Sequence, residues 1–172
     1  MGFFDSLKKV ANTITGGSAE VFLDAEPFRI GEPFEVKITA KVKDADLDIK
    51  RVYLKIVAKE EIQVPHYSFS HRIPKRNCDD ENEEETIYIE KTVKEDHTTL
   101  KLELNIAGNQ VLKANQAYEW IYRVDLPDGA QPVYRGKYCI HAYEACAGLD
   151  CFGNDPDSGW QELLPADAIS DN

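Results

Sequence analysis

Apolar and polar residues alternate one by one along most of the chain after residue 18. The clearest case is the segment 34–42, in which five apolar residues are separated by charged residues or threonine. Successive side chains of a strand point to opposite faces, so this pattern gathers the apolar ones on one face. It predicts a strand of an antiparallel sheet that has one buried and one wet face.

The same alternation recurs between turn residues such as Gly-Glu-Pro at 31–33 and Pro-Asp-Gly at 127–129. It predicts seven or eight strands, at residues 19–25, 34–42, 52–58, 86–93, 100–106, 118–126, 136–146 and 160–164. Helical periodicity does not interrupt this series. Short strands with frequent turns favour an all-β fold, which we expect to be an immunoglobulin- or arrestin-like sandwich of two antiparallel sheets.

The first 17 residues follow a helical period instead. Apolar residues, among them Phe3, Phe4 and Leu7, recur at spacings of three and four and predict a short amphipathic helix over residues 2–14. A glycine pair then ends it, because glycine adopts the left-handed conformation used at helix ends. The chain therefore divides into a helix with its linker (1–17), a sandwich (18–165) and a polar tail (166–172).

Residues 64–85 break the alternation. They include Pro65 and Pro74, and they end in an acidic run at residues 79–85 that carries six negative charges. Prolines, histidines and clustered charges predict a long surface loop. The acidic run, which begins with Asp79, Asp80 and Glu81, is either a solvated loop, a docking site for a basic partner or a weak trap for metal ions.

Composition narrows the function classes. The chain has 172 residues, is 42% hydrophobic and carries a formal net charge of −11. Such a charge repels phosphate backbones and anionic lipid, which excludes nucleic acid and disfavours a membrane surface as the partner of the helix. The sequence has neither a membrane-spanning stretch nor a signal-peptide pattern, so we expect a cytoplasmic protein with reduced cysteines.

Several short motifs, taken in order, resemble bacterial sporulation-control proteins of the arrestin-like superfamily. They span roughly residues 1–165, and their order rather than any single motif carries the resemblance. They are MGFF at 1–4, FRIGEPFEV at 28–36, DIKRVYL at 48–54, YEWIY at 118–122, LP at 126–127, Pro132, GKY at 136–138, LD at 149–150, DPD at 155–157 and WQEL at 160–163.

The resemblance implies an arrestin N-domain-like sandwich that acts as an adaptor or regulatory protein, without catalytic residues or cofactors. Members of the family usually carry a second sandwich domain, for which 172 residues leave no room. A one-domain chain could form a homodimer through its sheet edges instead. The surfaces that we expect to bind an unidentified protein partner include the side chains of Phe3, Phe4, Leu7, Asp79, Asp80 and Glu81.

A calcium-dependent binding module is the alternative function. The polar segment 150–159 carries four oxygen-bearing side chains, those of Asp150, Asn154, Asp155 and Asp157. Calcium takes six to eight oxygen ligands from such loops. The spacing lacks the glycine and the final glutamate of an EF-hand, and the same residue types also form ordinary turns.

Other chemistry finds little support in the sequence. Three cysteines and a histidine lie close together, at Cys139, His141, Cys146 and Cys151. Their spacing fits no zinc ribbon, so we interpret them as buried, reduced side chains. Motifs of serine hydrolases, zinc proteases and nucleotide-binding loops do not occur, and Glu60 and Glu61 point to opposite faces of one strand. The sequence therefore predicts no catalytic residues and no cofactor.

Overall fold

The computed structural model describes residues 18–74 and 84–169. In these residues the chain forms nine β-strands followed by a single turn of 3-10 helix. They are β1 (Ala19–Ala25), β2 (Phe34–Val42), β3 (Leu47–Pro74), β4 (Glu84–Ala107), β5 (Gln110–Leu112), β6 (Ala117–Val124), β7 (Tyr134–Arg135), β8 (Cys139–Cys151), β9 (Gln161–Leu163) and η3 (Ala166–Ile169).

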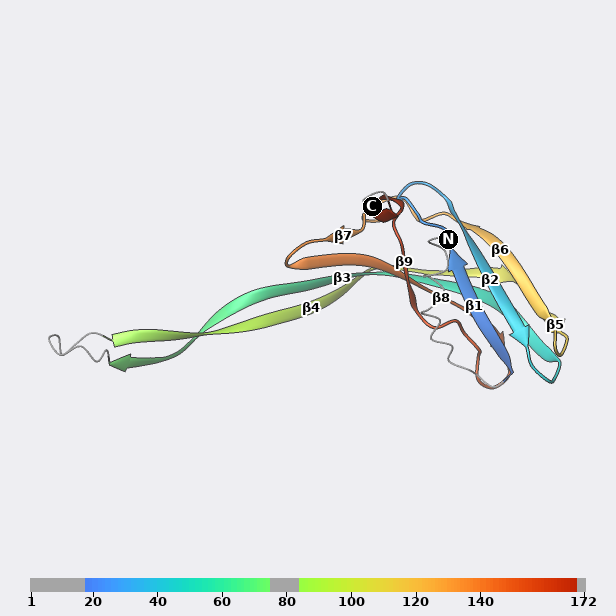
Figure 1. Ribbon diagram of the computed structural model, residues 1–172, viewed down its shortest axis with the longest axis horizontal. Helices are drawn as coiled ribbons and strands as arrows, with labels where there is room; N and C mark the ends of the chain where they lie inside the picture. Colours follow the sequence, from blue (N-terminus) through green and yellow to red (C-terminus); the bar gives the residue numbers. More distant parts are fainter. Residues whose placement is uncertain (1–17, 75–83, 170–172) are drawn as a thin grey trace, which may run out of the picture.

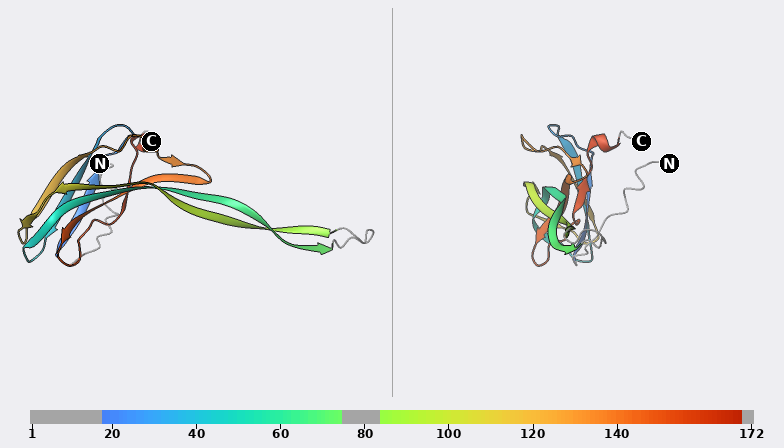
Figure 2. Two further views of the ribbon diagram at one scale, coloured as in Figure 1. Left: turned by 180° about the vertical axis from the view of Figure 1, so that it is seen from behind. Right: turned by 90° about the vertical axis from the view of Figure 1, so that its left-hand side faces the viewer.

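The strands form two antiparallel sheets. One has three strands in the order β1-β2-β6, and the other has six, with β4-β3-β8-β7 in line, β5 paired to β3 and β9 paired to β8. Figures 1 and 2 show the sheets as two layers at one end of the molecule, with β3 and β4 projecting from them as a ribbon. This arrangement confirms the predicted all-β fold with two antiparallel sheets.

The core lies between the two layers and follows from the alternation along the strands. In β2 the apolar residues Val36, Ile38 and Ala40 are buried, and across the core so are Leu54 and Ile56 of β3. Burial of each valine, leucine or isoleucine side chain stabilises the fold by roughly 1.5–3 kcal/mol. The sandwich therefore rests on the residues whose period predicted it.

An aromatic cluster closes the end of the sandwich nearest the ribbon. The ring of Phe28 packs between Phe34 and Tyr143, at centroid distances of 5.5 and 5.1 Å. The Phe28 backbone also joins the layers, because its N–H donates to the carbonyl oxygen of Leu164 (3.0 Å) and its own carbonyl accepts from the N–H of Ala166 (2.8 Å). The start of the predicted polar tail is thus fixed to the body through η3.

The ribbon corrects the largest error of the sequence analysis. The long loop predicted over residues 64–85 is wrong, because β3 runs to Pro74 and β4 begins at Glu84, and these two residues pair with one another. The two strands predicted at 86–93 and 100–106 are one strand, β4. Among the described residues no layer covers the ribbon, so burial imposes no alternation on its sequence.

Other differences are smaller. Strand β8 extends to Cys151, so the polar loop predicted from residue 150 begins later than expected. The predicted N-terminal helix and the residues Asp79, Asp80 and Glu81 lie outside the described residues. Within the described part of the chain, none of the helical structure could cross a membrane.

Candidate interaction surfaces

We define the arm as residues 64–74 of β3 and 84–93 of β4. Pairing of β3 with β8 ends at Ile62, which is opposite Cys139, and the N–H of Gln63 then donates to the carbonyl oxygen of Tyr138 (2.7 Å). Beyond this point β3 has only β4 as a neighbour. The arm is therefore a two-stranded ribbon that leaves the sandwich where β8 begins (Figure 1).

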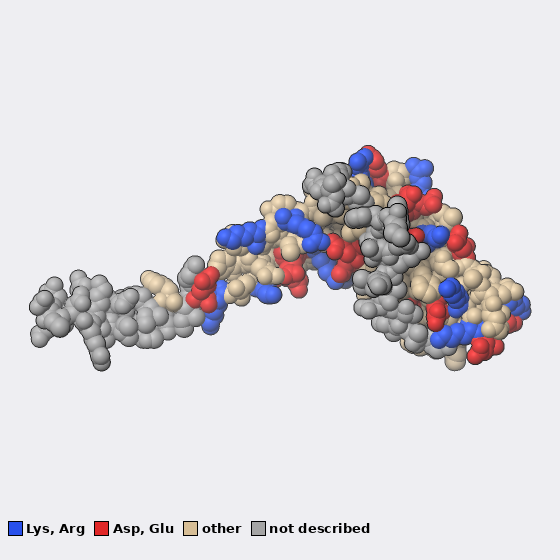
Figure 3. Space-filling view, viewed as in Figure 1, with Lys and Arg blue, Asp and Glu red and all other residues tan. Residues whose placement is uncertain are grey.

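The side chains of the arm that the structure describes are all exposed. Val64 and Val93 lie directly opposite each other and are each 39% exposed, and Tyr88 is 62% exposed. Lys91 and Glu90 carry charges of opposite sign beside these apolar residues. Figure 3 shows basic and acidic side chains interspersed along the ribbon near the body. The arm thus offers a mixed apolar and charged surface outside the core.

The arm also exposes backbone hydrogen-bonding groups on both sides. In the six-stranded sheet β4 is the first strand, so among the described residues its outer edge pairs with no strand. The opposite edge, that of β3, pairs with no other described strand from Val64 onward because β8 has ended. Open edges offer N–H and C=O groups to which another strand can add.

A buried histidine makes two hydrogen-bond contacts close to the point where the arm leaves the body. His141 is buried in β8, and its Nδ1 lies 2.9 Å from the carbonyl oxygen of Pro132, so Nδ1 carries a proton and donates it. Its Nε2 lies 2.7 Å from the hydroxyl of Thr99, which can donate to it. Thr99 is the extra residue at the register shift between Ala58 and Lys59, a bulge at which β4 bends out of the body.

Three of the four calcium candidates, the aspartates, use their carboxylates in contacts within the protein. Asp150 forms ion pairs with Lys50 and Arg51, at 3.7 and 3.1 Å. The carboxylate of Asp155 accepts a hydrogen bond from the N–H of Cys151 (3.0 Å), as turn-forming aspartates do.

The other two candidates, Asp157 and Asn154, make contacts within the same segment. Asp157 accepts from the N–H of Gly159 (2.8 Å), and the backbone oxygen of Asn154 lies 3.7 Å from the thiol of Cys151. In the described residues, no three side chains of His, Cys, Asp or Glu gather as metal ligands would. The structure offers the calcium alternative no support.

The cysteines behave as packing residues. Cys146 and Cys151 are buried free thiols, and Cys139 is half-buried in β8. Burial raises the pKa of the Cys146 thiol, and the nearby charge of Asp157 raises it further. A raised pKa keeps a thiol protonated and therefore a poor nucleophile.

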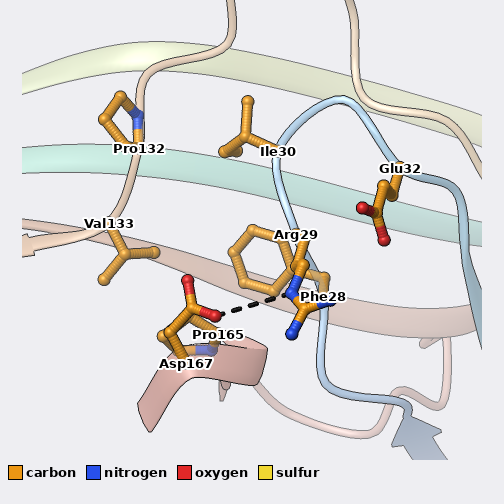
Figure 4. Close-up of a pocket in the computed structure, with 8 residues that line it drawn as sticks. All are labelled: Phe28, Arg29, Ile30, Glu32, Pro132, Val133, Pro165 and Asp167. Atoms are coloured by element: carbon orange, nitrogen blue, oxygen red, sulfur yellow. Dashed lines mark ion pairs between the residues drawn. The ribbon is translucent and has the colours of Figure 1, made fainter.

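A pocket of about 360 Å³ opens beside the aromatic cluster (Figure 4). Phe28 and Pro165 line its apolar side, while Arg29 and Asp167 form an ion pair on it, with Nε and Oδ1 3.5 Å apart. Its remaining lining residues are Ile30, Glu32, Pro132 and Val133. These eight lining residues combine no nucleophile with an adjacent base.

Comparison with known proteins finds a solved structure of similar fold. The structure is similar to that of Spo0M, a sporulation control protein from Bacillus subtilis, with a TM-score of 0.55 and 16% sequence identity. The likeness covers 87% of this chain and 49% of Spo0M, so the chain spans about half the length of that protein. No family model matches the sequence, and no curated protein matches it.

The two-stranded arm was not predicted from the sequence. The acidic run at residues 79–85 was predicted as a possible docking site within a loop. The residues on either side of it are strands, β3 and β4. One signal was available, since Thr86 to Val93 was predicted as a strand and a strand needs a partner. Pairing it backward with residues 64–74 would have revealed the ribbon.

Proposed function

We propose that this protein is a non-enzymatic regulatory or scaffold protein whose arm binds another protein. The observation that carries the proposal is the two-stranded arm, which exposes apolar side chains and two open edges far from the core. Exposed strand edges favour aggregation, and natural proteins commonly shorten or cover them. A long open ribbon retained on an otherwise well-covered sandwich therefore favours a surface that a partner covers.

Binding by strand addition follows from this geometry. A partner strand laid against β4 or against the outer part of β3 would complete a row of backbone hydrogen bonds. Each such bond contributes roughly 0.5–1.5 kcal/mol. Val64, Val93 and Tyr88 would then supply the side-chain contacts that distinguish one partner from another.

A regulatory role rests on the fold relation together with the order of motifs. Spo0M is described as a sporulation control protein, and its structure shares the fold. We propose that the present chain acts in a related way, as a binding protein in the bacterial cytoplasm. The free, buried thiols Cys146 and Cys151 are compatible with a reducing compartment.

The test is to shorten the arm while leaving the body intact. Residues 64–93 are replaced by Asn-Gly, a two-residue hairpin turn that connects the paired residues Gln63 and Lys94. Because the buried core lies outside the arm, we expect the shortened protein to keep its β-sheet circular dichroism and its cooperative melting. We expect it to lose partner proteins captured by the full chain from a lysate of the producing cells.

The control is a surface change away from the arm. Ile121 is an exposed residue of β6, in the other sheet, so Ile121→Lys should leave capture unchanged. Capture of the same partners, in the same amounts, by the shortened protein and the full chain would refute the proposal.

A further inference from the structure

A second apolar site lies on the outer face of the six-stranded sheet, away from the arm. It is a groove of about 280 Å³. Its lining residues are Lys55, Val57, Lys101, Leu102, Glu103 and Trp160. Trp160 is 50% exposed, whereas most large apolar residues of the body face the core. The groove is below the usual size of small-molecule sites, roughly 300–1,000 Å³, and fits side chains of a packed segment.

The floor beside this groove is built for close packing. Tyr53 lies across Gly148 of the neighbouring strand, where an added Cβ would be 2.3 Å from the tyrosine hydroxyl. The glycine therefore lets the aromatic ring lie flat against the sheet. Lys55 places its Nζ 4.6 Å from the centre of the same ring. Tyr53 is therefore buried on this face, whereas the Trp160 ring remains half-exposed.

We propose that residues 2–14 of this chain form an amphipathic helix that docks its apolar stripe in the Val57/Trp160 groove. These residues precede the described part of the chain, and their stripe contains Phe3, Phe4 and Leu7. An amphipathic stripe is stable in water only when something covers it. The groove offers such a cover within reach of the N-terminal segment.

The reach follows from the start of β1. Ser18 is fixed by a hydrogen bond from the N–H of Lys43 to its carbonyl oxygen (3.0 Å), and the side chain of Gln161 donates to the carbonyl oxygen of Leu23 (2.9 Å). Trp160 is next to Gln161 in the chain, so it lies about five residues along β1 from Ser18, which is ~17 Å of strand. It also lies about one sheet layer, ~10 Å, away from β1. A 13-residue helix is ~20 Å long, and its linker adds to that.

This docking is independent of what the arm binds. It also commits to one occupant, the chain's own N-terminus, and the competing occupants are a second copy of the chain and a lipid surface. The competitors can be told apart because only docking within one chain is independent of protein concentration and of added vesicles.

The test uses Trp160 as a reporter in the full-length chain. Trp120 is first replaced by phenylalanine, so that Trp160 is the only tryptophan. Its emission maximum and its quenching by acrylamide are then measured for this chain, for Leu7→Asp on the apolar stripe and for Val57→Asp in the groove. We expect each substitution to shift the emission to longer wavelength and to increase quenching, because each uncovers the Trp160 ring.

Lys9→Asp is the matched control, since residue 9 lies on the opposite side of the predicted helix from the stripe. It should leave both readings unchanged, and far-UV circular dichroism melts should show that all variants keep the fold. Equal emission and quenching in the parent and in Leu7→Asp would overturn the proposal. So would protection of Trp160 that appears only at concentrations at which the chain dimerises, or only with vesicles of anionic lipid.

Discussion

The two halves of strand β3 lie in opposite environments. From Val52 to Ala58 it runs between β4 and β8 and buries Val52, Leu54, Ile56 and Ala58 in the core between the sheets. From Val64 to Pro74 it keeps only β4, and its described side chains face solvent. The ladder between β3 and β4 continues through both halves, so the body half differs from the arm half in having β8 as a second neighbour and in the burial of its side chains.

This difference separates two sources of stability. In the body, the ladder is reinforced by apolar side chains packed between the layers. In the arm, the strands are held by the ladder and by cross-strand pairs such as Val64 with Val93, each of which contributes roughly 0.2–1 kcal/mol. Isolated two-stranded ribbons are marginally stable in water, so the arm depends on its attachment to the body.

The largest expected effect comes from matched truncations on the same strand. Leu54 and Val64 both belong to β3 and face an aliphatic residue of β4, Leu104 or Val93. Leu54→Ala leaves a cavity in the core and should reduce the free energy of unfolding by about 2–5 kcal/mol. Val64→Ala should reduce it by less than about 1 kcal/mol, because only one cross-strand pair is lost.

Urea denaturation followed by circular dichroism measures both free energies. Equal losses for the two variants would contradict the division of β3 into a buried and an exposed half. A loss that is large for Val64→Ala would mean that the arm is covered in the folded protein.

The junction of arm and body gives an intermediate effect. Thr99→Val removes the hydroxyl that faces His141 while nearly preserving its shape. The buried Nε2 of His141 then lacks a partner, which should cost about 1–3 kcal/mol of unfolding free energy. Thr99→Ser keeps the hydroxyl and should remain close to the parent protein in the same urea titration. Equal stability of the valine and serine variants would show that the hydrogen bond between Thr99 and His141 does not stabilise the junction of arm and body.

The contrast also explains what the sequence could predict. The strands 19–25 and 34–42 were predicted at their observed bounds, because each has one face in the core. Residues 64–74 of the arm were predicted as part of a loop, since a ribbon that is exposed on both faces places no constraint on which positions are apolar. Pro65 strengthened that error, although a proline is tolerated in a strand that has an open edge.

The candidate surfaces could be predicted only in part from the sequence. The position of Thr99 as a bulge depends on the register between β3 and β4, which no local pattern encodes. The groove at Trp160 joins residues of β3 and β4 to a residue that follows β8, and that proximity exists only after folding. Gly148 was a usable signal, because an isolated glycine within a strand often marks a close approach.

The smallest expected effect on stability comes from the end of the body opposite the arm. Its exposed polar contacts can be compared with those of the arm. Asp46 is solvent-exposed, and its carboxylate accepts hydrogen bonds from Nζ of Lys113 (2.8 Å) and from the N–H of Ala114 (2.9 Å). The bond from Lys113 is the main reason that the pKa of Asp46 lies below its usual value of 3.8. Exposed polar contacts of this kind contribute little, as do those of the arm.

The sign of the pH dependence follows from that lowered pKa. A carboxylate whose pKa is lower in the folded than in the unfolded chain stabilises the fold above the unfolded value of 3.8, and this stabilisation is lost as the pH falls through the folded value. Asp46→Asn keeps an acceptor but removes the charge, so its melting temperature should lie slightly below that of the parent near neutral pH. The difference should shrink as the pH falls below 3.8. A difference that stays constant through the acid range would mean that the Asp46 carboxylate does not hold this turn through its charge.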